Sequence, residues 1–269
     1  DRYDNKTFHA NFQPQVETGN DVLFVSNLEI GYEQPLSTVT VDLKRGEKLG
    51  ILGGNGLGKS TFLKTIVDKI PALSGEYKYG VNVQIGYFDQ QMAMYRSSKT
   101  VLDDYWDEFP NLTETEVRNS LGAFLFTGED VFKNISMLSG GEKVRCLLSK
   151  MMISGANVLV LDEPAAGLDP KGRKLLINLI KEYRKQTGST VIIVSHSMED
   201  VAKYVNRIIV MNQGEVLLDD APKVVFKEYK KLAFVVLISI VSDDSLTLNS
   251  GLQKSRNHTL CVGSSQNFA

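Results

Sequence analysis

Short apolar runs alternate with longer amphipathic stretches along most of the chain. Alternating apolar and polar positions over residues 22–27 and 38–43, separated by Gly31 and Pro35, predict two antiparallel strands. Other short runs are almost wholly apolar, which is typical of strands that are buried on both faces. These runs cover residues 48–52, 86–91, 157–161 and 190–195.

The segments between the apolar runs have the spacing of helices. Predicted helices cover residues 61–70, 139–153 and 170–186, and Pro71 ends the first of them. Residues 97–137 combine helical patterning with acidic residues and phenylalanines, which predicts a helical insertion at about 91–150. Because strands and helices alternate, we expect an α/β fold with a mainly parallel sheet and a small antiparallel β subdomain.

Composition limits the class of protein but does not identify it. The chain has 269 residues, 42% of them hydrophobic, enough for one large core or two modest ones. Its 30 basic and 32 acidic residues give a net charge of −2, so we expect no direct DNA binding. The longest apolar stretch, residues 233–241, is too short to cross a bilayer, and the polar start lacks a secretory signal. With only two cysteines as well, we expect a cytoplasmic protein.

A glycine-rich loop follows the apolar run over 48–52. The letters GGNGLGKS, residues 53–60, fit the spacing G-x-x-x-x-G-K-[ST] of a phosphate-binding loop. Its backbone N–H groups would meet phosphate oxygens at a helix N-terminus, Lys59 would reach the β and γ phosphates, and the Ser60 hydroxyl would bind Mg²⁺. The alternative is a chance glycine turn, which the flanking strand and helix argue against. The candidate nucleotide ligands here are Gly53, Asn55, Gly56, Gly58, Lys59, Ser60 and Thr61.

Two acidic residues follow the apolar run over 157–161. The carboxyl edge of a parallel sheet is where such folds bind ligands, so Asp162 would face the metal held by Ser60. Glu163 is then the candidate base that polarises the attacking water. Taken alone, the pair also fits a solvent-exposed acidic turn.

The letters LSGGE, residues 138–142, begin the next predicted helix. Ser139 and Glu142 have the spacing of a capping box, so an ordinary helix start is one interpretation. Gly140 and Gly141 leave bare N–H groups at the positive end of the helix, which suits a second anion site. One nucleotide in the same subunit cannot fill both sites, so this one requires a phosphate from elsewhere.

Three further residues are weaker candidates. His196 follows the run over 190–195 at the same sheet edge as Asp162, although a lone histidine there is more often structural. Gln90 ends another apolar run near that edge. Tyr32 suits stacking on adenine, although most strand tyrosines only pack.

These motifs, taken in order with the GLD of residues 167–169, resemble the ATP-binding cassette (ABC) ATPases. LSGGE separates that family from other phosphate-loop proteins. The resemblance implies that two such domains enclose two ATP molecules with Mg²⁺, each bound by the phosphate loop of one domain and the LSGGE of the other. It also implies that Asp169 crosses the interface, that His196 contacts the γ-phosphate, and that Gln90 joins Ser60 and Asp162 around the metal.

The resemblance changes along the chain. Residues 1–164 resemble the second cassette of ABC-F proteins, which act on ribosomes, whereas 165–232 resemble the ATPases of energy-coupling-factor importers. The change is marked by AAGLD, residues 165–169, where ABC-F proteins carry Thr-Asn-His-Leu-Asp. A natural recombinant, an engineered chimera and a mis-assembled reading frame would all give this pattern. We therefore expect a lead-in over 1–20, an ABC domain over 21–232, and an unassigned tail over 233–269 that is typical of disorder.

Three functions are compatible with these residues. The first is the ATP-binding subunit of an ABC transport system, which pairs with a second cassette as a homodimer or heterodimer and drives an integral membrane permease from the inner face of the membrane. The alternative is a ribosome-binding ABC-F cassette. A small-molecule kinase is the third, and LSGGE argues against it.

Overall fold

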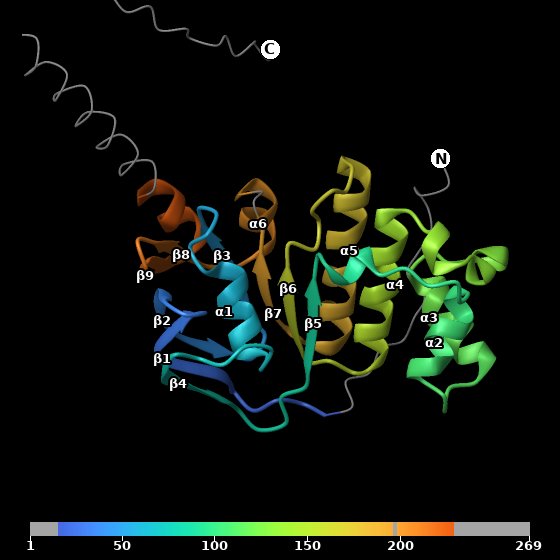
Figure 1. Cartoon of the computed structure of the whole chain (residues 1–269), viewed down its shortest axis with the longest axis horizontal. Coiled ribbons are helices and arrows are strands. Elements are labelled where there is room, and N and C mark those ends of the chain that lie inside the picture. The colour runs from blue at the N-terminus through green and yellow to red at the C-terminus, as the bar shows by residue number, and fades with distance from the viewer. Residues whose placement is uncertain (1–15, 196–197, 229–269) are drawn as a thin grey trace, which may run out of the picture. The chain divides into compact units, whose positions relative to one another are not determined.

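Two β-sheets share one hydrophobic core in the computed structural model, which describes residues 16–195 and 198–228. The smaller sheet is antiparallel, with the order β2-β1-β4, and the larger has the order β5-β6-β7-β3-β8-β9 (Figure 1). Strands β5 to β8 run parallel, and only β9 is antiparallel to its neighbour. The predicted α/β fold, with a mainly parallel sheet and a small antiparallel subdomain, is confirmed.

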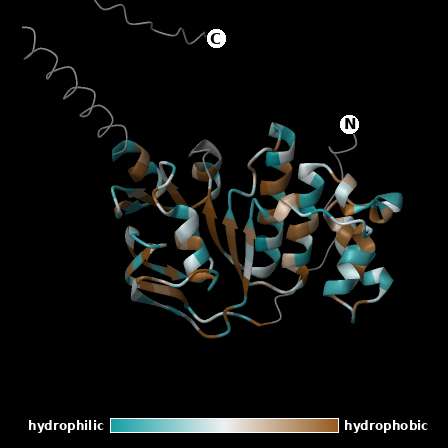
Figure 2. Cartoon of the chain, in the orientation of Figure 1, coloured by the Kyte–Doolittle hydropathy of each residue, from teal (hydrophilic) through white to brown (hydrophobic). Residues whose placement is uncertain are grey.

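The antiparallel strands are β1 (Asp21–Gly31), β2 (Pro35–Lys44) and β4 (Ser74–Tyr79). The larger sheet consists of β3 (Lys48–Gly53), β5 (Ile85–Asp89), β6 (Val158–Asp162), β7 (Thr190–Val194), β8 (Arg207–Asn212) and β9 (Glu215–Asp220). Every residue of β6 and β7 is buried, which explains their continuous apolar sequence. Figure 2 shows the same contrast between apolar strands and mixed helix surfaces.

Helix α1 (Lys59–Ile66) packs in the core that the two sheets share, through Phe62, Leu63 and Ile66. The predicted helix over 61–70 ends earlier than expected. Asp68 adopts a left-handed backbone conformation with φ 60°, so the chain turns away before Pro71 is reached.

Helices α4 (Gly140–Ile153) and α1 cover opposite faces of the larger sheet. On β5, a side chain at Gly86 would collide with Met151 of α4, whereas the neighbouring Tyr87 packs against the core around α1. Helix α5 (Pro170–Thr187) contacts α4, and α6 (Met198–Tyr204) packs on β3, where a side chain at Gly50 would meet Val201. The residues that begin α1 and α4 therefore belong to different layers.

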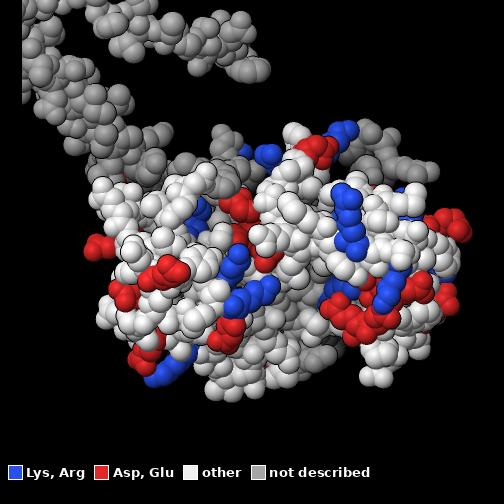
Figure 3. Space-filling model, in the orientation of Figure 1, with Lys and Arg blue, Asp and Glu red and all other residues white. Residues whose placement is uncertain are grey.

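The predicted helical insertion consists of short pieces. It contains α2 (Val101–Glu108), α3 (Glu114–Ala123) and the 3₁₀ turns η1 (Met92–Met94), η2 (Gly128–Phe132) and η3 (Ile135–Met137). The Tyr105 hydroxyl lies 2.7 Å from that of Ser120 and 2.9 Å from that of Ser149, so one buried polar cluster joins α2, α3 and α4. Lys150 of α4 also pairs with Asp104. In Figure 3, acidic side chains gather over this region.

The junction near residue 165, where the family resemblance changes, joins two segments that contribute to one core. Strand β7 follows the junction but lies between β6 and β3, which precede it. Arg207 of β8 bonds to Asp219 at 2.7 Å and also pairs with Glu47, on the earlier side, at 3.4 Å. The parts of the chain before and after residue 165 therefore share both apolar and ionic contacts.

The described residues divide at Val225. The chain up to Val225 forms one compact unit, and a second begins at Phe226. The expected tail over 233–269 and most of the lead-in over 1–20 lie outside the described residues. Within the described ranges, no helix is long and apolar enough to span a membrane.

We predict that Ile192→Ala lowers the free energy of unfolding by about 2–4 kcal/mol, since it leaves a cavity between the segments on either side of the junction. Ile192 is 1% exposed in β7. Urea unfolding followed by circular dichroism measures the change, with exposed Lys78→Ala as the control. A loss below about 1 kcal/mol would show that β7 is poorly packed against its neighbours.

Candidate functional site

The glycine loop joins β3 to α1. Gly56 and Gly58 have φ angles of 77° and 89°, a region that favours glycine. No side chain caps the N-terminus of α1, which begins directly after Gly58. The positive end of this helix, and the N–H groups of its first turn, therefore suit an anionic ligand.

Lys59 is the cation of this loop. Its Nζ donates hydrogen bonds to the carbonyl oxygens of Gly53 at 2.9 Å and Gly54 at 2.7 Å. Burial lowers the pKa of Lys59, while the nearby carboxylates of Glu163 and Asp162 act to raise it. A buried ammonium held directly by neutral carbonyls is suited to gain a phosphate oxygen as a partner.

Ser60 and Asp162 meet at the carboxyl edge of the larger sheet. The Ser60 hydroxyl donates to Asp162 Oδ1 at 3.0 Å, across 102 residues of sequence. Burial raises the pKa of Asp162, and the neighbouring Asp89 raises it further, whereas the Ser60 hydrogen bond opposes the shift. Hydroxyl and carboxylate oxygens are ligands that suit Mg²⁺, which takes its remaining ligands from water and phosphate. These donors fit the metal, although the described residues hold no cluster of three His, Cys, Asp or Glu side chains.

Glu163 follows directly, in an uncommon backbone conformation. Its φ is 53°, in the left-handed region. Its N–H donates to the Val194 carbonyl at 3.1 Å and its own carbonyl accepts from Ala166 at 3.0 Å, so both neighbours hold the bend. Such conformations cost about 1–3 kcal/mol and concentrate at functional sites.

The LSGGE segment begins α4. Ser139 accepts the Glu142 N–H at 3.3 Å and Glu142 accepts the Ser139 N–H at 2.8 Å, so the capping box is formed. A side chain added at Gly140 would meet nothing within 4 Å, and both Ser139 and Gly140 are exposed. Packing within this subunit therefore does not explain the glycine at 140.

The other residues that the sequence analysis selected lie on different elements of the fold. Asp169 is the N-cap of α5, where it accepts the Gly172 N–H at 2.9 Å, a local role that we did not anticipate. Tyr32 is 61% exposed just after β1, and Gln90 is exposed just after β5. His196 lies outside the described residues.

A carboxylate that the sequence analysis missed stands next to Gln90. Asp89 pairs in register with Asp162 on the neighbouring strand, and its Oδ2 lies 3.7 Å from Lys69 Nζ. The available signal was a charged residue closing an apolar strand in the letters IGYFDQQ.

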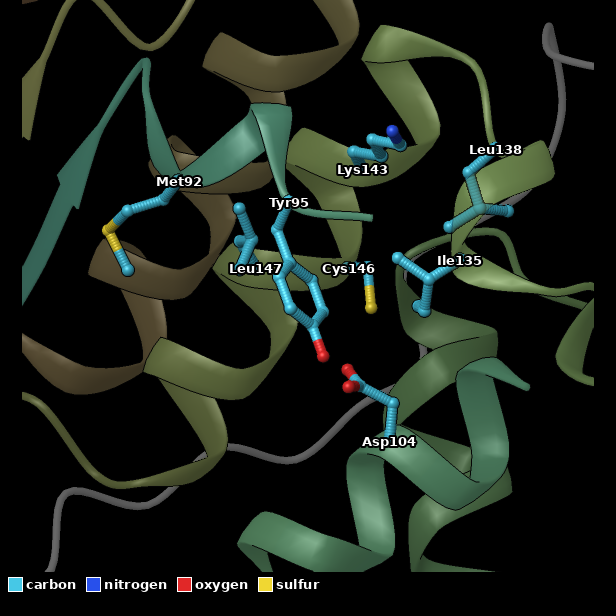
Figure 4. A pocket seen from close by; sticks show the side chains of 8 residues that line it. All are labelled: Met92, Tyr95, Asp104, Ile135, Leu138, Lys143, Cys146 and Leu147. Atoms are coloured by element: carbon cyan, nitrogen blue, oxygen red, sulfur yellow. The ribbon is translucent and has the colours of Figure 1, made fainter. Parts of the chain in front are cut away.

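A small pocket lies between η1, α2, η3 and α4 (Figure 4). Most of its lining is apolar, and the Tyr95 hydroxyl points toward Asp104. The lining residues are Met92, Tyr95, Asp104, Ile135, Leu138, Lys143, Cys146 and Leu147. Met94 and Met137 are both exposed on the neighbouring turns.

Comparisons with known proteins decide the family. Residues 36–166 match the family model described as ABC transporter. The chain is 34% identical over 218 residues to the energy-coupling factor transporter ATP-binding protein EcfA2 of Acetivibrio thermocellus, covering 77% of that protein and 74% of this chain. This chain belongs to the ABC transporter ATPases. The predicted resemblance is thereby confirmed.

Other relatives of this ABC ATPase are much longer than it is. It is 42% identical over 216 residues to the putative ATP-binding protein YdiF of Bacillus subtilis, covering 79% of this chain but 33% of YdiF. The chain spans about a third of the length of the first curated relatives it matches. The structure of cbiO1 from Clostridium perfringens, described as part of the ABC transporter complex cbiONQ, superposes with a TM-score of 0.66 and 29% identity, covering 96% of that chain and 81% of this one.

We predict that Asp162→Asn stabilises the nucleotide-free ABC ATPase at pH 7. The folded pKa of Asp162 lies above its unfolded value, so its charge destabilises the fold increasingly as pH rises from about 3.8 through the raised pKa. Asparagine keeps an acceptor for Ser60 without the charge. Thermal melting should give a higher midpoint for the variant, by a margin that shrinks toward acidic pH. An equal or lower midpoint at pH 7 would contradict this.

Proposed function

We propose that this chain binds Mg²⁺-ATP at the glycine loop, hydrolyses it in a site completed by a second ABC cassette, and thereby drives a membrane partner. The observation that carries the proposal is the Ser60–Asp162 hydrogen bond at the uncapped start of α1. It joins the loop that suits phosphate to the carboxylate that suits the metal.

The proposal gives each candidate residue a role that suits its place. Lys59 leaves the Gly53 and Gly54 carbonyls to neutralise the terminal phosphates, while the N–H groups from Gly53 to Thr61 hold their oxygens. Ser60, Gln90 and Asp162 hold Mg²⁺, which when bound screens the phosphate charge. Glu163 accepts a proton from the attacking water. Tyr32, exposed beyond β1, stacks on the adenine.

A second cassette accounts for the exposed start of α4. Ser139, Gly140 and Gly141 form a positive helix end on the other face of the sheet from α1. The γ-phosphate of a nucleotide on the partner cassette is a ligand of the right charge for it. On this proposal, Asp169 contacts the partner and His196 contacts the γ-phosphate.

A membrane partner is supported by the relatives and by two exposed methionines. EcfA2 is named as a transporter ATP-binding protein, and cbiO1 as part of a transporter complex. Met94 and Met137, which are exposed on turns next to lining residues of the pocket, suit contact with an apolar segment of such a partner. If purification of the chain from solubilised membranes recovers no integral membrane protein with it, the proposed membrane partner is contradicted.

Ribosome binding is the second candidate function. Its support is the resemblance of residues 1–164 to ABC-F proteins, together with 34% identity over 216 residues to ABC transporter F family member 5 of Arabidopsis thaliana, covering 31% of that protein. Ribosome binding requires that the chain co-sediments with ribosomes and that the amount bound changes when ATP is added and when Glu163→Gln is introduced.

We predict that Lys59→Ala weakens ATP binding about 10- to 100-fold, since a charge-assisted contact of about 1.5–3 kcal/mol is lost. Isothermal titration measures the affinity, and Lys78→Ala, at an exposed position of β4, is the matched lysine control. Equal affinity in the Lys59 variant would rule out this role.

We predict that Glu163→Gln accumulates as an ATP-bound dimer, because binding survives while water activation is lost. Size-exclusion chromatography with light scattering, in ATP and Mg²⁺, measures the mass. The double variant Lys59→Ala, Glu163→Gln is the control and should remain monomeric. A monomeric Glu163→Gln protein at saturating ATP contradicts the shared site.

A further inference from the structure

The turn that carries Gln90 is closed by the side chain just before it. Asp89 is the last residue of β5 and is 7% exposed. Its Oδ1 accepts the N–H of Met92 at 3.0 Å, and the Gln90 carbonyl accepts the N–H of Ala93 at 3.2 Å. The backbone of Gln90 is therefore held by the β5–β6 strand pairing before it and by the hydrogen bond from Met92 to Asp89 after it.

The carboxylate of Asp89 is fixed by a second partner. Lys69, which follows α1, places its Nζ 3.7 Å from Asp89 Oδ2 and 4.4 Å from the centre of the Tyr87 ring. The two oxygens of Asp89 thus face different partners, one a backbone N–H and one an ammonium. A charged acceptor gives a stronger hydrogen bond than a neutral one, and the ammonium offsets part of the cost of burying it.

This arrangement stands directly beside the proposed metal ligands. Asp89 pairs in register with Asp162, whose Oδ1 accepts from Ser60. Two buried carboxylates on adjacent strands repel each other. Asp89 therefore adds to the electrostatic cost of the nucleotide-free site, although its hydrogen bond with Met92 and its pairing with Lys69 hold the local turn.

We infer that Asp89 is a positioning residue for Gln90: its carboxylate closes the turn that aims the Gln90 side chain at the Mg²⁺ side of the nucleotide site. The inference rests on the proposed roles of Ser60, Gln90 and Asp162. The same hydrogen bond fixes the backbone of Met92, whose side chain lines the pocket in Figure 4. One carboxylate thus ties the nucleotide edge of the sheet to the wall of that pocket.

The test is the Mg²⁺ dependence of binding of a fluorescent, non-hydrolysable ATP analogue. In Asp89→Ala, the Mg²⁺ concentration for half-maximal enhancement of binding rises about five- to tenfold, while binding without Mg²⁺ is unchanged. Asp89→Asn, which retains an acceptor for Met92, stays within about twofold of the original protein. Equal Mg²⁺ dependence in Asp89→Ala, or an asparagine variant as impaired as alanine, overturns the inference.

The matched control is Glu116→Ala, which removes a similar carboxylate-to-backbone hydrogen bond, from Thr113, in the helical insertion. It lowers thermal stability without moving the Mg²⁺ dependence. In a Gln90→Ala background, Asp89→Ala has no further effect, because Asp89 acts through Gln90. Additive effects in that double variant would contradict the positioning role.

Two more measurements separate the possible failures. We expect Ser60→Ala to abolish the Mg²⁺ enhancement of binding, and an unchanged Mg²⁺ response in this variant refutes the proposed function. If Ser60→Ala loses the response but Asp89→Ala keeps it, only the role of Asp89 is refuted. Amide hydrogen exchange at Met92 in the unsubstituted protein requires no variant to fold. Protection there increases on binding Mg²⁺ and the analogue, and unchanged protection counts against the inference.

Discussion

Parallel alignment of strands is the constraint on which the candidate site depends. Because β3, β5, β6 and β7 run in the same direction, the residues that follow them emerge at one edge of the sheet. That edge brings Ser60, after β3, to within 3.0 Å of Asp162, at the end of β6. Reversing β3 or β6 would separate the phosphate loop from Asp162 and Glu163. The apolar core beneath holds the alignment.

Much of this arrangement was predictable from residue patterns. The continuous apolar runs identified β3, β6 and β7 because strands covered on both faces exclude polar residues, and the glycine loop fixed the place of α1. Strand β4 was not predicted, since its sequence SGEYKY is mostly exposed and its place depends on pairing with β1. The helical insertion was recognised only as a region. Its division into α2 and α3 depends on capping at Thr113 and on the buried contacts of Tyr105.

The candidate site was also only partly predictable. The spacing of the motifs selected Lys59, Ser60 and Asp162, which the fold brings together. Spacing does not reveal that Asp89 lies beside Asp162, because that proximity comes from strand register between residues 73 apart. The cap formed by Asp169 shows the converse case, in which a residue singled out for an interface also has a local structural partner. The change of resemblance near residue 165 does not interrupt the core, since β7 is buried between strands that precede it.

The central claim is that each catalytic site takes residues from two chains, and mixing two inactive variants tests it most directly. Lys59→Ala removes the phosphate cation but keeps the start of α4, whereas Gly140→Glu keeps the glycine loop and places a carboxylate where the partner's phosphate should lie. In a symmetric dimer, an equal mixture forms half mixed dimers, each with one intact composite site, so ATPase activity should recover to about a quarter of the unsubstituted level. Activity that stays at the level of the separate variants, or a Gly140→Glu protein that is fully active alone, would contradict the shared site.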